Sequence, residues 1–103
     1  MSRKEKSESF VNEGYNVNVI GRHIEVTEPM KNYAIEKISK LERLDPRLID
    51  VNVTMDIQKL DHRVEIWMQF NNLKIRSHAS SDNMYASIDK ATDRLQHQLR
   101  KYK

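Results

Sequence analysis

The 103-residue chain contains no cysteine, which excludes disulfide bonds and metal sites with cysteine ligands. Its two glycines, Gly14 and Gly21, are too few for a glycine-rich loop that holds phosphates. No apolar run approaches the ~20 residues that cross a bilayer. The polar residues 1–9 also lack the apolar stretch of a signal peptide. We therefore expect a single-domain cytoplasmic protein.

Signals of catalysis are equally sparse, because no Gly-x-Ser-x-Gly nucleophile motif occurs. Asp50, Asp56, Glu65 and His62 have the side-chain types of a metal site, but the solvated half of alternating strands explains them better. His23 is interpreted as a surface histidine rather than a general base. We predict that the protein is not an enzyme and needs no cofactor, metal ion or small-molecule substrate.

Alternating apolar residues predict strands at residues 15–20, 49–57, 64–70 and 73–79. The dipeptide Asn71-Asn72 suits a tight hairpin between the last two strands. Helical spacing predicts a helix that starts after the N-cap Thr27 and ends at Asp45-Pro46. Ser81-Asp82-Asn83 supplies capping groups for a second helix, whose apolar stripe comprises Met84, Ile88, Ala91, Leu95, Leu99 and Tyr102.

The predicted order is β-α-β-β-β-α, in the α+β class. A helical connection makes the first two strands parallel, and the remaining strands form an antiparallel meander. Since each strand has one apolar face, both helices must cover the same face of a four-stranded sheet, and the other face is open to water. Residues 1–14 are expected to be a flexible leader, and residues 15–103 the folded domain.

Positive charge is concentrated towards the C-terminus. Residues 1–60 contain ten basic and ten acidic residues, whereas residues 74–103 contain seven basic and three acidic residues, a net charge of +4. On the last helix a basic stripe adjoins the apolar one, and its members recur at steps of three and four: Lys90, Arg94, His97 and Lys101. Aligned cations on a rigid element suit a phosphate backbone.

A second set of cations, Lys37, Lys40 and Arg43, lies on a flank of the first helix. If the helices lie side by side, this flank and the stripe of the last helix would form one basic groove, which Arg22 would extend. The alternative is two unrelated faces with local salt bridges, and spacing alone does not decide between them. The candidate RNA-binding set is Arg22, Lys37, Lys40, Arg43, Arg76, Lys90, Arg94, His97 and Lys101.

The single tryptophan, Trp67, is expected on the open face of the sheet. An indole there can stack on a base, or it can cover neighbouring side chains. The aromatic-rich motifs of RNA-recognition sheets are absent, so we expect the second role.

Several segments together resemble the ribosome hibernation promoting factor and ribosome-associated inhibitor family. They are Ile20-Gly21, Ile24-Glu25-Val26-Thr27-Glu28, Lys40-Leu41-Glu42 and Asn83-Met84-Tyr85-Ala86-Ser87-Ile88-Asp89, the last followed by Arg94-Leu95 and Gln98-Leu99. The resemblance covers residues 16–101. Asn83 departs from the acidic residue that the family usually has before Met-Tyr, a change that affects helix capping more than function.

The resemblance implies a fold similar to double-stranded RNA-binding domains. It also implies binding to the small ribosomal subunit and its rRNA in the mRNA and tRNA channel, and inhibition of translation during starvation or stationary growth. The family's basic helix positions correspond to Lys37, Lys40, Arg43, Arg94, His97 and Lys101. His97, usually arginine in relatives, would make a weaker contact whose charge depends on pH, and Lys90 rests on spacing alone.

The length resembles that of short family members, which lack the separate C-terminal domain that pairs ribosomes, and we expect a monomer off the ribosome. Two other classes remain open. A stand-alone module for structured RNA explains the basic groove equally well, and a protein-interaction domain that modulates transcription has no supporting feature in these residues. Sedimentation with ribosomes would separate the three.

Overall fold

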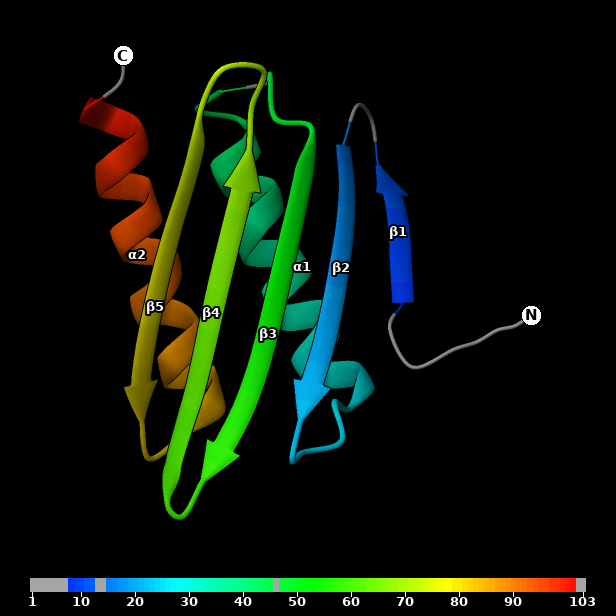
Figure 1. The fold of residues 1–103 in the computed structure, drawn as a ribbon, viewed down its shortest axis with the longest axis vertical. Coiled ribbons are helices and arrows are strands. Elements are labelled where there is room, and N and C mark those ends of the chain that lie inside the picture. Colours follow the sequence, from blue (N-terminus) through cyan, green and yellow to red (C-terminus); the bar gives the residue numbers. More distant parts are fainter. Residues whose placement is uncertain (1–7, 13–14, 46, 102–103) are drawn as a thin grey trace.

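The computed structural model describes residues 8–12, 15–45 and 47–101. One sheet carries two helices on one of its faces (Figure 1). The elements, in chain order, are β1 (Glu8–Asn12), β2 (Tyr15–Arg22), α1 (Glu28–Glu42), β3 (Asp50–Gln58), β4 (Asp61–Gln69), β5 (Lys74–Ser81) and α2 (Met84–Lys101).

The strands lie in the sheet in sequence order, from β1 to β5. β2 and β3 are parallel, with Val17 opposite Val51, and every other neighbouring pair is antiparallel. The backbone of Phe70 donates a hydrogen bond to Leu73 O (2.7 Å), which closes the predicted two-residue turn between β4 and β5. The predicted order β-α-β-β-β-α is therefore confirmed from residue 15 onward.

The sheet nevertheless has five strands rather than four. Glu8–Asn12, which the sequence analysis placed in a flexible leader, instead form β1 along the free edge of β2. An uncovered edge leaves backbone N–H and C=O groups without partners, and an antiparallel neighbour satisfies them. The rest of the expected leader, residues 1–7 and 13–14, lies outside the described residues.

The core lies between the sheet and the two helices. Alternate strand residues point into it, as the period of two requires, and each helix contributes one apolar stripe. The fully buried aliphatic side chains come from both layers and include Val17, Val53, Ile66, Ile38, Ile88 and Leu95. Tyr102, the last predicted member of the apolar stripe, lies outside the described residues.

Both helices begin at the capping residues that the sequence indicates. Thr27 accepts a hydrogen bond from the backbone N–H of Met30 (3.3 Å). Asn83 Oδ1 accepts bonds from the backbone N–H groups of Tyr85 (2.8 Å) and Ala86 (3.3 Å). The cap therefore fixes where α2 starts relative to the end of β5.

The first helix ends earlier than the predicted stop at Asp45-Pro46. Its last residue is Glu42, and the backbone N–H groups of Leu44 and Asp45 turn back onto Leu41 O and Glu42 O. The Asp45 carboxylate then accepts hydrogen bonds from the backbone and side chain of Arg47. These contacts shape the connection to β3.

The connection from β2 to α1 is tight. A Cβ atom on Gly21 would lie 2.5 Å from Ile24 O and 2.8 Å from Val26 Cγ2, so this position requires glycine. His23 adopts a left-handed conformation (φ 58°) and its Nδ1 pairs with Asp56 Oδ1 at 2.9 Å. Neither described helix is long and apolar enough to cross a membrane.

Candidate nucleic-acid interface

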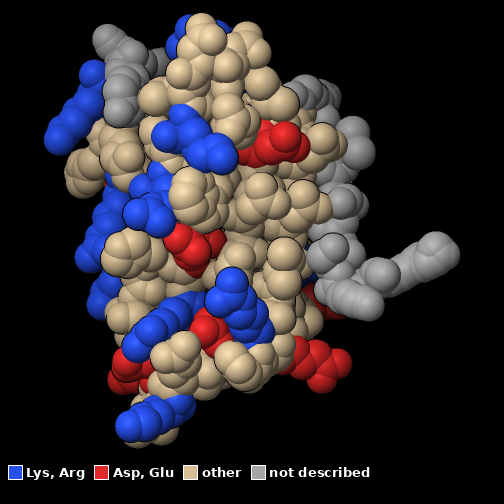
Figure 2. All heavy atoms as spheres, viewed as in Figure 1, with Lys and Arg blue, Asp and Glu red and all other residues tan. Residues whose placement is uncertain are grey.

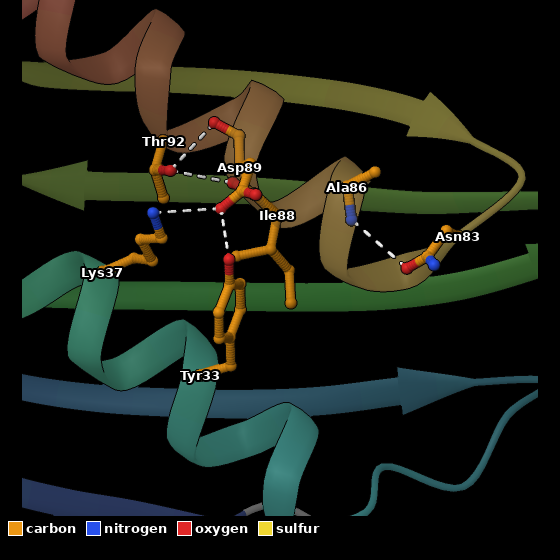
Figure 3. Close-up of polar contacts among 7 residues, drawn as sticks. All are labelled: Tyr33, Lys37, Asn83, Ala86, Ile88, Asp89 and Thr92. Atoms are coloured by element: carbon orange, nitrogen blue, oxygen red, sulfur yellow. Dashed lines mark hydrogen bonds and ion pairs between the residues drawn. The ribbon is translucent and has the colours of Figure 1, made fainter.

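The flank of α2 that faces α1 is occupied by contacts within the fold. The Tyr33 hydroxyl donates a hydrogen bond to Asp89 Oδ1 (2.7 Å), and Lys37 Nζ lies 3.1 Å from the same oxygen (Figure 3). The rings of Tyr33 and Tyr85 pack edge to face at 5.2 Å, and Lys37 lies over the Tyr33 ring at 5.5 Å. The Lys37 charge is thus compensated by Asp89.

The pKa values of these groups follow from the shared carboxylate. Burial raises the pKa of Asp89, but hydrogen bonds from Tyr33 and Lys37 outweigh it and place the pKa below its ordinary value. The same carboxylate raises the pKa of Tyr33, whose neutral hydroxyl is the donor, and the pKa of Lys37, whose ammonium is the donor. The cluster is therefore most stable with Asp89 ionised and its two partners protonated.

The opposite flank of α2 reaches the free edge of β5. Arg94 Nη1 donates to His78 O, and Gln98 Nε2 donates to Arg76 O at 3.0 Å. β5 is the last strand of the sheet, so these side chains supply donors to carbonyls that no strand satisfies. They also place the basic stripe of α2 beside β5.

The predicted groove between the two helices stays a prediction. Asp89, which faces α1, and Arg94, which reaches β5, lie on different flanks of α2. Arg22 does not extend such a groove, because it alternates with buried Val17 and Val19 and lies on the open face of the sheet. Of the two predicted sets of cations, Lys37 therefore lies between the helices, whereas Arg94 lies on the flank away from α1.

The structure instead groups cations along one side of the molecule. Lys74 and Arg76 are exposed on β5, and the stripe of α2 lies next to them. Basic side chains run down the side where Figure 1 shows β5 and α2 (Figure 2). We call this surface the β5–α2 rim and define it by Lys74, Arg76, Lys90, Arg94, His97 and Lys101.

The rim keeps most of its charge unpaired within the part of the chain that the structure describes. Arg76 lies 3.5 Å from Glu65, but Lys90, Arg94 and Lys101 make no ion pair among the described residues. On α1, Lys40 and Arg43 are exposed and likewise without an ion pair there. Of the nine predicted contacts, Lys37 and Arg76 are those with a carboxylate partner among residues 8–12, 15–45 and 47–101.

The sequence-based prediction omitted one residue of the site, Lys74, and gave too little weight to another, Trp67. Lys74 was not included among the candidates, although its position two residues before Arg76 on a strand places both on one face. Trp67 does lie on the open face, with Lys74 Nζ 5.2 Å and the Arg76 guanidinium carbon 5.0 Å from its ring centre. The two cations and the indole form one cluster.

The carboxylates considered for metal binding have other partners. Asp56 accepts hydrogen bonds from His23 (2.9 Å) and Gln58 (3.2 Å); the bond from His23 is the main reason that the pKa of Asp56 is lowered, against the opposing effect of burial. Among the residues that the structure describes, no three His, Asp or Glu side chains are arranged to hold a metal ion.

Fold and surface together define a class of protein, an α+β domain with two helices on one face of the sheet and a basic rim suited to nucleic acid. Residues 17–103 match the model of the family described as Sigma 54 modulation protein / S30EA ribosomal protein, and the chain belongs to this family.

Individual relatives agree with this assignment. A ribosome hibernation promoting factor from Pseudomonas putida is 37% identical over 87 residues, which cover 84% of this chain and 85% of the relative. A ribosome hibernation promotion factor from Deinococcus radiodurans is 41% identical over 88 residues, covering 81% of this chain and 46% of that protein. The N-terminal domain of Protein Y from Thermus thermophilus superposes with a TM-score of 0.77 and 28% identity, over 82% of this chain and 94% of that domain.

Proposed function

We propose that the protein is a ribosome hibernation factor. It binds the small ribosomal subunit in the channel used by mRNA and tRNA, and inhibits translation under starvation or in stationary phase. The names of the curated relatives support the ribosome as partner. The β5–α2 rim is the single observation on this chain that carries the proposal, because it presents unpaired cations on rigid elements.

Binding through the rim is electrostatic. Each phosphate that a lysine or arginine neutralises releases condensed counterions, and affinity falls with salt by a slope of roughly 0.9 per contact on a duplex. Arg94 is held by His78 O, so less side-chain entropy is lost when its guanidinium meets a phosphate. The rim therefore positions the domain on rRNA.

Inhibition follows from the shape of the bound domain. The sheet and its helices form a rigid body with principal extents of 38, 34 and 20 Å, and such a body seated in the channel excludes mRNA and tRNA by volume. Lys40 and Arg43 on α1 give this body a second basic surface, which would meet rRNA on another wall of the channel. No catalytic step is required.

The test is sedimentation of the full chain with purified small subunits, large subunits and intact ribosomes over a salt series. We expect salt-sensitive co-migration with the small subunit, competition by tRNA, and inhibition of translation in a purified system. Binding to the large subunit alone, or co-migration that leaves translation unaffected, would contradict the proposal.

The main competing function is a stand-alone module for structured RNA, which the rim would serve equally well. The same salt series with a free RNA hairpin separates the two functions. Tight hairpin binding without ribosome binding would replace the ribosome proposal with this one.

A further inference from the structure

The open face of the sheet, which shares only Lys74 and Arg76 with the β5–α2 rim, carries two adjoining hollows. One has a volume of 550 Å³, and Ile20, Asn52, Trp67, Gln69 and Lys74 are among the residues that line it. The other, of 390 Å³, reaches Arg63 and Ser80. Both are also lined by Arg22, Thr54 and Glu65, so they form one track across the sheet.

An aromatic platform stands at one end of this track. Trp67 is half-buried between Asn52 on β3 and Arg76 on β5, which are its register partners. Arg76 lies over the indole and is tethered by Glu65 at 3.5 Å, and Lys74 lies over the same ring. Cations therefore stand within reach of any group that stacks on this ring.

The charges beside Trp67 favour an anionic ligand at this end of the track. The acidic residues that line the track have partners within the fold: Asp56 is bonded to His23 and Gln58, Glu65 is paired with Arg76, and Asp50 accepts a hydrogen bond from the Asn16 amide. The cations Arg22 and Lys74 make no ion pair within the described parts of the chain. A phosphate that reaches the indole meets the positive charges of Lys74 and Arg76.

We propose that this track binds single-stranded RNA, with one base stacked at Trp67, the phosphate beside that base held by Lys74, and a phosphate further along the strand held by Arg22. Every base has a π-face that stacks on an aromatic ring, and Arg or Lys beside the ring adds to the attraction. In a duplex the bases are already stacked, so duplex RNA cannot use the indole. An acidic peptide would meet the two cations but would leave the ring without a stacking partner.

Fluorescence reports directly on this site, because Trp67 is the single tryptophan of the chain. The full chain is titrated with a short oligoadenylate, with a duplex of equal charge, and with a polyglutamate peptide. We expect saturable quenching by the oligoadenylate alone, weakened by added salt. Quenching by the peptide without quenching by the oligoadenylate, or equal quenching by duplex and single strand, would overturn the proposal.

Variants then test the ring and the cations. Trp67→Leu is expected to weaken binding of a labelled oligoadenylate roughly ten-fold, measured by anisotropy, and Trp67→Phe less. Leu60→Ala is the matched control, because Leu60 is apolar, 84% exposed and absent from both hollows. Should Trp67→Leu fail to fold, Lys74→Ala gives the same test. Unchanged binding in folded Trp67 and Lys74 variants would overturn the proposal.

This inference goes beyond the proposed function and fails separately from it. A chain that co-sediments with small subunits while Trp67 emission ignores the oligoadenylate would refute the track and leave the ribosome proposal standing. A chain that shows the Trp67 response but ignores ribosomes would support the track alone.

Discussion

The two flanks of α2 each carry a charged residue, and the fold uses the two charges in opposite ways. On the flank towards α1, Asp89 is bonded to Tyr33 and paired with Lys37. On the flank towards β5, Arg94 donates to the backbone carbonyl of His78, an uncharged group that leaves the positive charge in place. The first flank orients one helix against the other, whereas the second offers charge to a ligand.

This difference shows that the availability of a lysine or arginine for binding phosphate depends on the residues around it, and not only on its residue type. Lys37 and Arg94 both belong to the candidate set, yet Lys37 has a carboxylate 3.1 Å away and Arg94 has none among the described residues. A phosphate approaching Lys37 would compete with Asp89 and would be repelled by it. Breaking each flank separately should therefore affect stability on one side and binding on the other.

The largest effect is expected where α2 meets the core. Leu95 is fully buried, so Leu95→Ala should lower the free energy of unfolding by about 3 kcal/mol. Arg94→Ala, one residue earlier, should cost less than about 1 kcal/mol, because an exposed hydrogen bond is replaced by water. Urea unfolding measures both. Similar losses for the two variants would show that Arg94 has a structural role.

The next effect concerns the flank towards β5. The double variant Arg94→Ala, Lys101→Ala removes two proposed phosphate contacts, so it should bind small subunits about 50-fold more weakly at ~0.1 M salt, with a salt slope lower by roughly 1.8. The control is Lys37→Ala with Arg47→Ala, which removes two cations that have carboxylate partners. Sedimentation over a salt series should leave this control close to wild type. If the control loses more affinity than the rim variant, the assignment of the flanks is reversed.

A smaller effect is expected on the flank towards α1. Asp89→Asn keeps the shape of the side chain but removes its charge, and should cost about 1 kcal/mol because the side chain is 43% exposed. Asp93→Asn is the matched control, since Asp93 is exposed on the same helix without an ion pair in the described residues.

The pH dependence of this loss has a defined sign. The folded pKa of Asp89 lies below its ordinary value of 3.8, so its stabilisation is present above that value and is lost as the pH falls through the folded pKa. The folded pKa values of Tyr33 and Lys37 lie above 10.0 and 10.5, so their stabilisation is present below those values and is lost as the pH rises further. The stability difference between wild type and Asp89→Asn should be largest between these two pH limits. Thermal unfolding of both proteins across pH would measure it. A constant difference would contradict this account.

The smallest expected effect is a gain in binding affinity through the β5–α2 rim. His97→Arg places a permanently charged guanidinium on the exposed stripe, which should tighten small-subunit binding roughly two- to five-fold and steepen its salt dependence. The measurement is the same salt series. Unchanged affinity and salt slope in this variant would place His97 outside the contact surface.

Much of the fold was predictable because local rules agree with the tertiary structure. Thr27 and Asn83 both cap helices where their side chains are expected to do so. The alternation around Val53 and Ile66 predicted strands whose apolar face is buried. Such patterns depend on neighbours within a few residues, so they can be read from the sequence directly.

The errors concern contacts between distant segments. β1 has a weak pattern of its own, and its strand conformation depends on pairing with β2. The spacing of residues along α2 shows that its basic stripe lies beside its apolar stripe. The spacing does not show which neighbouring element the basic stripe will face. Strand order decides this, because β5 is the edge strand and α2 packs beside it with α1 on the inner side.

The amino-acid sequence by itself determined the two helices, the strands from β2 to β5, their caps, and the concentration of positive charge near the C-terminus. The tertiary structure alone decided which charges are neutralised and which stay available. Tyr33 and Asp89 are 56 positions apart and meet because the sheet places their helices side by side. Charge compensation acts over a few ångströms in space, and a sequence gives no distances between segments that only the fold brings together.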